Sequence, residues 1–198
     1  MTIVLGSDHA GFPLKEAVRA HFEEKGIDYI DVGCYSPERF DYAVSAQIAC
    51  DKVSAGEADM AILCCGTGVG ISMAANKVKG IRACCCSDYF SAKYTRLHND
   101  ANCLCMGARV IGEGTALELV DVFINTKFEG GRHQTRILTL SDSRLLRQIR
   151  CSDRAIKCLR QCRFSTASDW ECAYIQCCRR ADGAYLFRAL PQKAMQSL

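Results

Sequence analysis

The chain has 198 residues, of which 49% are hydrophobic and 24% charged, a composition typical of a globular protein with a core of its own. No apolar run approaches the ~20 residues that a membrane-spanning helix needs, so we expect no transmembrane segment. The N-terminus reaches Asp8 without a basic segment, which argues against a signal peptide, and the 15 cysteines then favour a cytoplasmic protein with reduced, mostly buried thiols.

The net charge of +3 is unevenly distributed along the chain. Residues 1–142 contain 14 Lys and Arg against 18 Asp and Glu, a net charge of −4, and include all four histidines. Residues 143–198 contain 11 basic and 4 acidic residues, a net charge of +7, and six of the 15 cysteines. We therefore predict a folded domain over residues 1–142 and a basic, cysteine-rich C-terminal extension over residues 143–198.

The extension carries no motif that assigns it a role. Its cysteines are not spaced as paired C-x-x-C knuckles, which argues against a zinc module. Its positive charge would permit weak, salt-sensitive binding to the phosphates of a nucleic acid or a membrane, but it has one Trp and no stacking motif. We favour an extension with no defined role and expect no nucleic-acid or membrane partner.

Residues 1–140 alternate between short apolar runs and segments in which apolar residues recur with helical spacing. In chain order we expect a strand at residues 2–6, a helix at 12–25, a strand at 27–32, a helix at 41–55, a strand at 60–64, a helix at 69–77, a strand at 81–86, a helix at 89–97, a strand at 102–106, a helix at 115–125 and a last helix after residue 131. Short strands that alternate with helices predict an α/β fold in three layers, with a doubly wound, Rossmann-like sheet of five parallel strands.

A glycine-rich loop follows the third expected strand at residues 64–70, with the sequence Cys-Cys-Gly-Thr-Gly-Val-Gly. Glycines allow successive backbone N–H groups to converge, and the N-terminus of the following helix adds partial positive charge, so the loop is suited to hold an anion. A thiol, Cys65, and a hydroxyl, Thr67, lie beside these donors. This combination indicates chemistry on a small, oxygen-rich substrate rather than phosphate binding alone.

Other polar residues follow the strands at the edge where ligands bind in such sheets, beyond the carboxyl ends. Asp8 and His9 follow the first strand, and Tyr42 lies beyond the second. His98 instead ends the fourth expected helix, at the opposite edge of the sheet, which suggests either that it serves the site of a neighbouring subunit or that a loop folds back. The two remaining histidines, His21 and His133, are interpreted as ordinary residues, with His133 a bystander near the site.

Three arginines are candidates for binding a phosphate group. Arg132 and Arg136 are four residues apart, so on a helix they share one face and form a fork for one phosphate. Arg109 follows the fifth strand and is the third candidate. For each arginine the alternative is a solvated surface charge.

The other candidates also have purely structural interpretations, which the sequence alone leaves open. Cys65 could be one more buried thiol, and Asp8 could cap the first helix. His98 could be a cation favoured by the helix dipole, and Tyr42 could pack in the core.

A set of ordered motifs carries a resemblance to a known family. The motifs are Gly6-Ser7-Asp8-His9-Ala10-Gly11, Asp41-Tyr42, Cys65-Gly66-Thr67-Gly68-Val69-Gly70, Ala74-Ala75-Asn76-Lys77, His98-Asn99-Asp100-Ala101-Asn102, Gly107-Ala108-Arg109 and Glu129-Gly130-Gly131-Arg132-His133-Gln134-x-Arg136. Over residues 1 to about 140 the chain strongly resembles ribose-5-phosphate isomerase type B, in the family that also holds galactose-6-phosphate isomerase subunits. Residues 141–198 resemble nothing in that family.

The resemblance implies an aldose–ketose isomerase that interconverts ribose 5-phosphate and ribulose 5-phosphate, a step of the pentose phosphate pathway in carbohydrate metabolism. It implies an enediolate intermediate and no metal or other cofactor. Cys65 would be the base at carbon 2, and Thr67 would act on the sugar oxygens. The backbone N–H groups of the loop, among them those of Gly66, Gly68 and Gly70, would face the developing oxyanion.

The same resemblance implies roles for the remaining candidates. His98 would open the furanose ring, and Asp8 would act on the ring and hydroxyls. The implied substrate contacts are His9, Arg109, Arg132 and Arg136 at the phosphate, Asn99 at the enediolate or hydroxyls, and Tyr42 at the mouth of the pocket. Since the family's sites combine residues of two subunits, the resemblance also implies a homodimer or a dimer of dimers.

Two positions depart from the family's pattern. Ala43 follows Tyr42 where the family usually has proline, which changes the loop but removes no functional group. One branch of the family has a glutamate base one residue after the glycine loop, where this chain has Ile71. The resemblance therefore points to the branch that uses a cysteine, here Cys65, as the base.

Two other functions stay open. The length of the pocket decides between a five-carbon sugar and a six-carbon phosphosugar such as allose or galactose 6-phosphate. The sequence does not reveal that length. A nucleotide- or phosphate-binding module without catalysis is a more distant alternative, because the loop reads G-x-G-x-G after the third strand and lacks the lysine of a P-loop.

Overall fold

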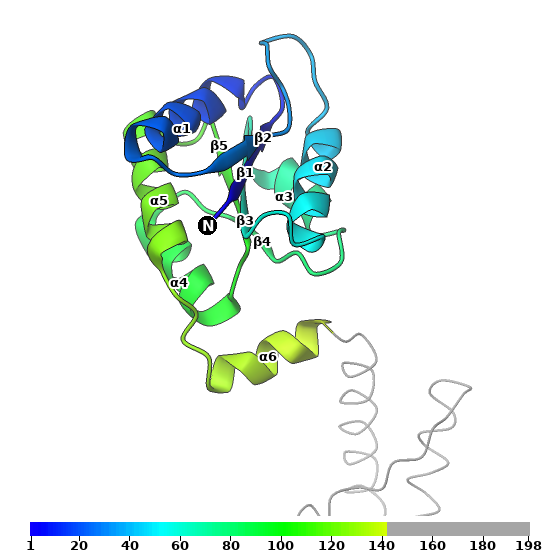
Figure 1. The fold of residues 1–198 in the computed structure, drawn as a ribbon, viewed down its shortest axis with the longest axis vertical. Helices are drawn as coiled ribbons and strands as arrows, with labels where there is room; N and C mark the ends of the chain where they lie inside the picture. The colour runs from blue at the N-terminus through cyan, green and yellow to red at the C-terminus, as the bar shows by residue number, and fades with distance from the viewer. Residues whose placement is uncertain (142–198) are drawn as a thin grey trace, which may run out of the picture. The chain divides into compact units, whose positions relative to one another are not determined.

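The computed structural model describes residues 1–141. Strands and helices alternate along them: β1 (Ile3–Ser7), α1 (Phe12–Lys25), β2 (Tyr29–Asp31), α2 (Tyr42–Ser54), β3 (Met60–Cys65), α3 (Val69–Ala75), β4 (Ala83–Cys85), α4 (Tyr89–Asn99), β5 (Cys103–Gly107), α5 (Glu113–Asn125) and α6 (Arg132–Ser141) (Figure 1). Every expected element is present in the expected order, with ends shifted by a few residues. The extension expected at residues 143–198 lies outside the described residues.

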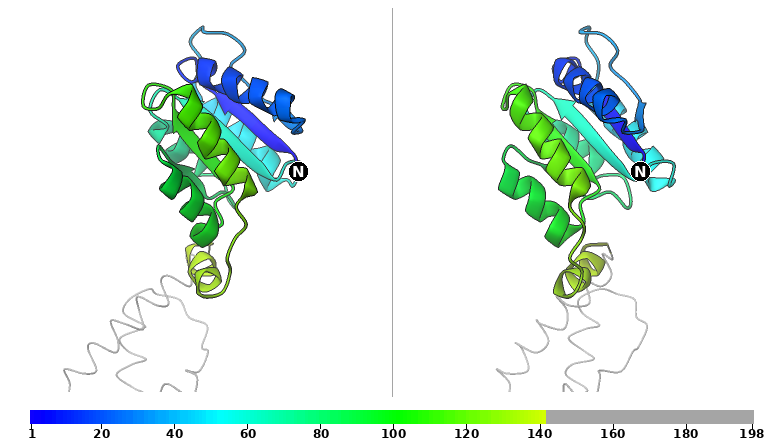
Figure 2. Two further views of the ribbon diagram at one scale, coloured as in Figure 1. Left: turned by 90° about the vertical axis from the view of Figure 1, so that its left-hand side faces the viewer. Right: turned by 60° about the vertical axis from the view of Figure 1, so that its left-hand side comes forward.

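The five strands form one parallel sheet in the order β2-β1-β3-β5-β4. Helices α1, α4 and α5 cover one face of the sheet, and α2 and α3 cover the other, as the views in Figure 1 and Figure 2 show. The predicted three-layer, Rossmann-like architecture is therefore confirmed. The strand order reverses between β1 and β3, and ligands bind at such a switch point, beyond the carboxyl ends of the strands.

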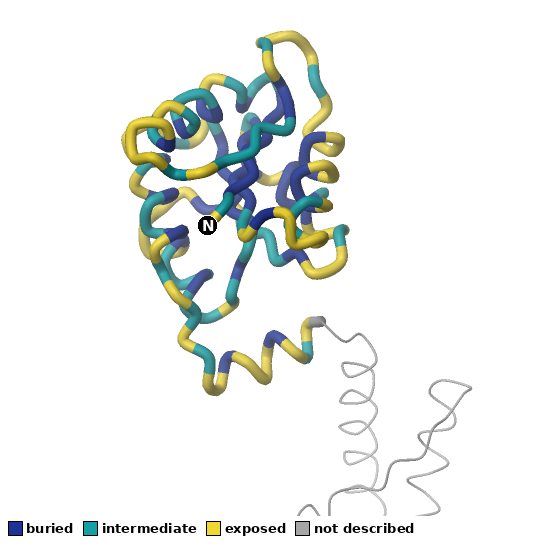
Figure 3. Tube along the Cα trace, viewed as in Figure 1, coloured by how far each residue is buried: buried dark blue, intermediate teal, exposed yellow. Residues whose placement is uncertain are grey.

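Two apolar clusters fill the space between the sheet and its two helical layers. Figure 3 shows that buried residues concentrate on the strands and recur along the helices. Of the nine cysteines among the described residues, all are free and seven are buried. Burial raises the pKa of the Cys64 thiol to about 12 and that of Cys105 to about 11, so both are held as neutral, apolar groups. Within residues 1–141, the expectation of mostly buried thiols is thus confirmed.

Short-range signals fix where the helices begin. Asp41 accepts a hydrogen bond from the backbone N–H of Ala43 at 2.8 Å and caps α2. Asp88 accepts one from the backbone N–H of Ser91 at 2.8 Å and caps α4.

No helix among the described residues is long and apolar enough to span a membrane.

The direction of the strands defines two ends of the sheet. At the carboxyl end, Cys65 on β3 lies in register with Gly107 on β5. At the amino end, the backbone N–H of Ala61 donates to the carbonyl of Asn102 at 2.9 Å. Helix α4 ends at Asn99, just before β5 begins, so its last turn lies at the amino end. The glycine loop and the end of α4 therefore lie at opposite ends of the sheet.

Candidate active site

At the carboxyl end, the glycine loop lies directly against the end of β5. A Cβ atom added to Gly107 would lie 2.6 Å from the carbonyl carbon of Thr67, an approach that only glycine permits. The backbone N–H of Ala108 donates to the carbonyl of Cys65 at 2.9 Å, and that of Arg109 donates to the carbonyl of Gly66 at 3.0 Å. The loop is thus held in place by backbone contacts rather than by flexible side chains.

Cys65 is the last residue of β3, and its side chain is turned toward this loop. The residue is only 4% exposed, and its Sγ accepts a hydrogen bond from the backbone N–H of Gly68 at 3.1 Å. An N–H donor at this distance stabilises negative charge on the sulfur. Cys64 points to the opposite face, into the cluster beneath α1, as the alternation of side chains along a strand requires. Thr67 is exposed, and its Oγ1 lies 3.4 Å from the backbone nitrogen of Val69.

The segment after β1 packs against the same end of the sheet. A Cβ atom on Gly11 would lie 2.2 Å from the carbonyl oxygen of Cys64. Asp8 is buried and accepts a hydrogen bond from the Gly11 backbone N–H at 2.7 Å, so it shapes the turn before α1 instead of capping the helix itself. The Nδ1 atom of His9 lies 3.2 Å from the carbonyl oxygen of Phe40, which fixes the imidazole ring.

Tyr42 and Arg109 border the glycine loop. Tyr42, the first residue of α2, is 41% exposed, and its ring would lie 3.0 Å from a Cβ atom on Gly70, so it covers the loop instead of packing in the core. The Arg109 side chain would lie 3.7 Å from a Cβ atom on Gly66. The carboxyl end therefore gathers Asp8, His9, Tyr42, Cys65, Gly66, Thr67, Gly68, Gly70 and Arg109.

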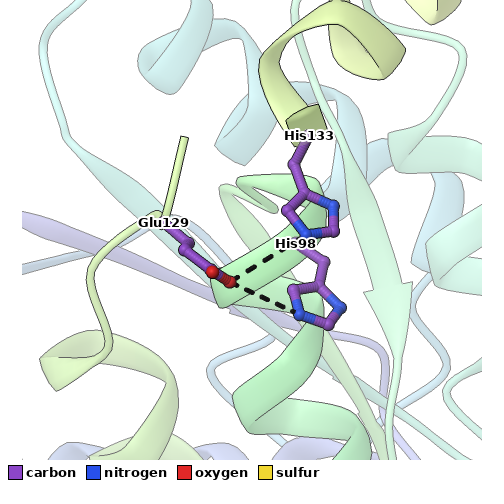
Figure 4. A group of neighbouring side chains, drawn as sticks. All are labelled: His98, Glu129 and His133. Atoms are coloured by element: carbon purple, nitrogen blue, oxygen red, sulfur yellow. Dashed lines mark ion pairs between the residues drawn. The ribbon is translucent and has the colours of Figure 1, made fainter. Parts of the chain in front are cut away.

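The amino end carries a second group of polar side chains (Figure 4). His98, in the last turn of α4, stacks on His133 of α6, with ring centroids 4.1 Å apart and an interplanar angle of 8°. A carboxylate oxygen of Glu129 lies 3.6 Å from Nε2 of His98 and 3.9 Å from Nε2 of His133. Asn99, the last residue of α4, is exposed beside this group.

The two arginines of α6 belong to the same end. The segment is helical as expected, so Arg132 and Arg136 lie on one face, and both are exposed. The Arg132 Nε–H donates to Nε2 of His133 at 3.3 Å. Burial lowers the pKa of His133, and so do the charges of His98, Arg132 and Arg136, while Glu129 raises it. This concentration of positive charge is suited to a phosphate group.

The candidate residues thus form two groups, and a single copy of the chain does not bring them together. Cys65 and its neighbours lie at the carboxyl end, whereas His98, Asn99, Arg132 and Arg136 lie at the amino end. The sequence places His98 at the opposite edge from the loop, and the structure confirms this. Arg109 lies with Cys65, so the three candidate arginines do not form one cluster within the chain.

Sequence reasoning missed two members of the second group, Glu129 and His133. His133, interpreted from the sequence as a bystander near the site, is 4% exposed and stacked on His98. Within residues 1–141, His98, Glu129 and His133 are the group whose ligand atoms are close enough to share a metal ion, within 4.8 Å. The two rings are nearly parallel, however, so their Nε2 lone pairs do not converge, and Arg132 donates to one of them. The arrangement is that of a carboxylate beside two stacked imidazole rings.

Known proteins match the part of the chain that holds both groups. The sequence model of the ribose/galactose isomerase family matches residues 3–140. Ribose-5-phosphate isomerase B of Escherichia coli (strain K12) is 50% identical over 135 residues, which are 68% of this chain and 91% of the relative. The structure of ribose-5-phosphate isomerase B from Clostridium thermocellum is similar with a TM-score of 0.70 and 43% identity, over 71% of this chain and 95% of that one.

A further solved structure is that of ribose-5-phosphate isomerase B from Mycoplasma genitalium with bound ribulose-5-phosphate. It has a TM-score of 0.67 and 39% identity, and the match covers 71% of this chain and 93% of that one. Because these relatives are isomerases and are matched over nearly their whole length, a binding module without catalysis is no longer supported. The chain is an isomerase and belongs to the ribose/galactose isomerase family.

Proposed function

We propose that the chain interconverts ribose 5-phosphate and ribulose 5-phosphate, with Cys65 as the base. The observation that carries this proposal is the position of the Cys65 Sγ at the glycine loop, where the Gly68 backbone N–H donates to it at 3.1 Å. The identity with the Escherichia coli relative and the ribulose-5-phosphate bound to the Mycoplasma genitalium relative support a five-carbon substrate.

The chemistry starts from the open-chain aldose. The Cys65 thiolate takes the proton from carbon 2, the electron pair left behind forms a double bond to carbon 1, and the carbonyl pair moves onto oxygen 1. Backbone N–H groups of the loop stabilise this enediolate, and loss of one such donor typically costs about 10²–10³ in rate. The thiol then returns its proton to carbon 1, while Thr67 assists transfer of the hydroxyl proton from oxygen 2 to oxygen 1. The products are the ketose and the regenerated thiolate.

Ring opening precedes this step. The hydroxyl proton on oxygen 1 of the furanose must leave, and the ring oxygen must gain a proton as its bond to carbon 1 breaks. An imidazole can accept and donate protons near neutral pH, so His98 is suited to this transfer, and Asp8 would orient the ring and its hydroxyls. Asn99 would bind the enediolate or hydroxyls, and Tyr42 would close the pocket. The phosphate would be bound by His9, Arg109, Arg132 and Arg136.

This division of roles requires a homodimer, or a dimer of dimers, because Cys65 and His98 lie at opposite ends of one chain. Exposed apolar side chains on α2 and α3 favour a second copy as the partner. They are Tyr42, Val44 and Ile48 on α2 and Val69 and Met73 on α3, and the two helices pack against each other. A two-fold arrangement that puts the carboxyl end of one copy beside the amino end of the other would complete two equal sites.

We also propose that residues 1–142 form the complete catalytic domain. The family match ends at residue 140, and the part of this chain that aligns with the Escherichia coli relative accounts for 91% of that protein. The extension would then be dispensable for turnover.

The test is an isomerisation assay of the purified chain without added metal, in which NMR follows the ketose formed. Ribose 5-phosphate, allose 6-phosphate and galactose 6-phosphate are compared at equal concentration, and Cys65→Ala serves as the inactive control. We expect turnover of ribose 5-phosphate to exceed that of both six-carbon sugars. Faster turnover of a six-carbon sugar would replace the proposed substrate, and absence of turnover with all three would contradict the proposal.

A further inference from the structure

We propose that Glu129 and His133 are positioning residues for His98, holding its imidazole in one orientation with one nitrogen protonated. This inference rests on the proposed function, because His98 acts on the sugar only if the chain opens the ring as described above. Neither Glu129 nor His133 needs to touch the substrate for this role. Both come from the segment after α5, far from His98 in the sequence.

A backbone contact places Glu129 beside His98. The N–H of Glu129 donates to the carbonyl of Leu97, the residue before His98, at 3.0 Å. The carboxylate is thereby brought to the last turn of α4, with its oxygen 3.6 Å from Nε2 of His98. A carboxylate at this place favours the proton on Nε2, which in the neutral ring leaves Nδ1 as the acceptor. Glu129 thus determines which nitrogen of His98 can take a proton from the sugar.

Aromatic contacts fix the plane of the His98 ring. His133 stacks on one side at 4.1 Å, and Tyr94, one turn earlier on α4, meets the ring edge-on at 5.0 Å with an interplanar angle of 69°. Phe90, one further turn back, stacks on Tyr94 at 4.1 Å. His98 is therefore one ring in a row of four, which limits its rotamers and lowers the entropy that it loses when substrate binds.

In this row, His133 provides an uncharged stacking surface on one side of the His98 ring. It is buried, whereas the side chain of His98 is 33% exposed. Since the Arg132 Nε–H donates to Nε2 of His133, that nitrogen is an acceptor and carries no proton. Burial and the surrounding positive charges favour the same neutral form. A flat, uncharged ring can stack on His98 without repelling a proton that His98 takes up.

The test separates the charge of Glu129 from the ring of His133. Glu129→Gln keeps the shape and the backbone contact but removes the charge. We expect kcat to fall about tenfold, the lower end of the loss that follows when a partner orienting a metal-bound histidine is removed. KM should change less than about twofold, because the phosphate-binding arginines are untouched. The matched control is Glu57→Gln, since the Glu57 side chain is 57% exposed against 58% for Glu129 and is also ion-paired, at 2.8 Å to Lys52. It should behave as wild type.

For His133, the two variants differ in whether a ring remains. His133→Ala removes the stacking surface and should lower kcat about as much as Glu129→Gln, whereas His133→Phe keeps a neutral ring and should retain most of the rate. Thermal melts of both variants confirm that each is folded. Equal rates in the two folded variants would overturn the role of the stacked ring.

A readout independent of turnover is the protonation of the His98 ring, followed by long-range ¹⁵N–¹H NMR of the full chain at pH about 8, where imidazoles are ordinarily neutral. We expect the proton on Nε2 in the wild type and a mixture of the two tautomers in Glu129→Gln. Wild-type kcat in Glu129→Gln overturns the proposal. If the wild type turns over no phosphosugar, the proposed function fails, and the tautomer in the two proteins alone then decides whether Glu129 positions His98.

Discussion

The two ends of the sheet place their functional groups by different means. At the carboxyl end, Cys65 is held by backbone: the pairing of β3 with β5, a hydrogen bond from Gly68, and close contact between Gly107 and the loop. At the amino end, His98 is held by side chains, the stacked ring of His133 and the carboxylate of Glu129. A group that is held by backbone contacts tolerates few substitutions in the residues around it. A group that is held by side chains tolerates conservative replacement of those side chains.

This difference matches the demands of the two proposed steps. Proton transfer at carbon needs a base and oxyanion donors in one fixed geometry, which a rigid loop supplies. Ring opening moves protons between oxygens, which an imidazole can do once its orientation is set. The two ends can cooperate only between two copies of the chain, so each copy would contribute half of two sites.

The largest effect is expected at the thiol of the carboxyl end. Cys65→Ala removes the proposed base and should lower kcat about 10²–10⁴-fold, the range that general acid–base groups contribute. The fold and the affinity for inorganic phosphate should persist, since the alanine leaves the loop backbone unchanged. Steady-state kinetics compare it with Cys64→Ala, whose side chain faces the opposite cluster and which should stay active. Near-normal turnover by Cys65→Ala would show that Cys65 is not the base.

The rigidity of the same end can be tested at Gly107. In Gly107→Ala, the new methyl group would lie 2.6 Å from the Thr67 backbone, so the loop must move, and kcat should fall at least about tenfold with a loss of about 1–3 kcal/mol in the free energy of unfolding. Gly114→Ala is the control, because a Cβ atom there meets nothing within 4 Å. Denaturant unfolding and kinetics are measured for both. If the two variants behave alike, the loop is not held by close backbone contact.

A smaller effect is expected from the arginines of the amino end. Arg136→Lys keeps the charge but loses the planar fork, so KM for ribose 5-phosphate should rise roughly three- to tenfold with kcat nearly unchanged. Arg19→Lys, on α1 and ion-paired to Glu16 and Glu23, is the control. An unchanged KM in Arg136→Lys would show that Arg136 is a solvated surface charge.

The smallest effect is expected on the stability of the fold at acidic pH. The pKa of His133 in the folded chain is lowered, first by burial and then by the charges of His98 and Arg132, from an ordinary value of 6.5. The unfolded chain therefore binds this proton more readily, so His133 costs no stability above pH about 6.5 and destabilises the fold as the pH falls below it. Thermal melts from pH 8 to 5.5 should show a smaller decline for His133→Phe than for the wild type. A parallel decline would mean that His133 titrates alike in both states.

Local signals in the sequence were sufficient for the elements and for one end of the site. Asp41 and Asp88 mark helix starts that the structure confirms, and residues 64–70 combine the glycines with the thiol. The edge strands are shorter than expected: β2 covers Tyr29–Asp31 and β4 covers Ala83–Cys85. Each pairs on one side only, whereas the apolar run in the sequence continues beyond the paired residues.

The amino end was less predictable because its contacts join segments distant in the sequence. The stacking of His98 on His133 and the approach of Glu129 depend on how the segment after α5 returns to α4, which no periodicity reveals. The Glu-x-x-x-His spacing of Glu129 and His133 was the available signal, but this spacing does not indicate that His98 completes the group. The position of β5 between β3 and β4 likewise depends on tertiary packing.

The most direct test of the account is complementation between two inactive variants. Cys65→Ala and His98→Ala are each purified, mixed in equal amounts, unfolded and refolded together, and assayed with ribose 5-phosphate. If Cys65 of one copy works with His98 of the other, each hybrid dimer holds one intact site, and random pairing should restore roughly a quarter of wild-type activity. If the mixture stays as inactive as the separate variants while hybrid dimers form, the site is not shared between copies and the account is contradicted.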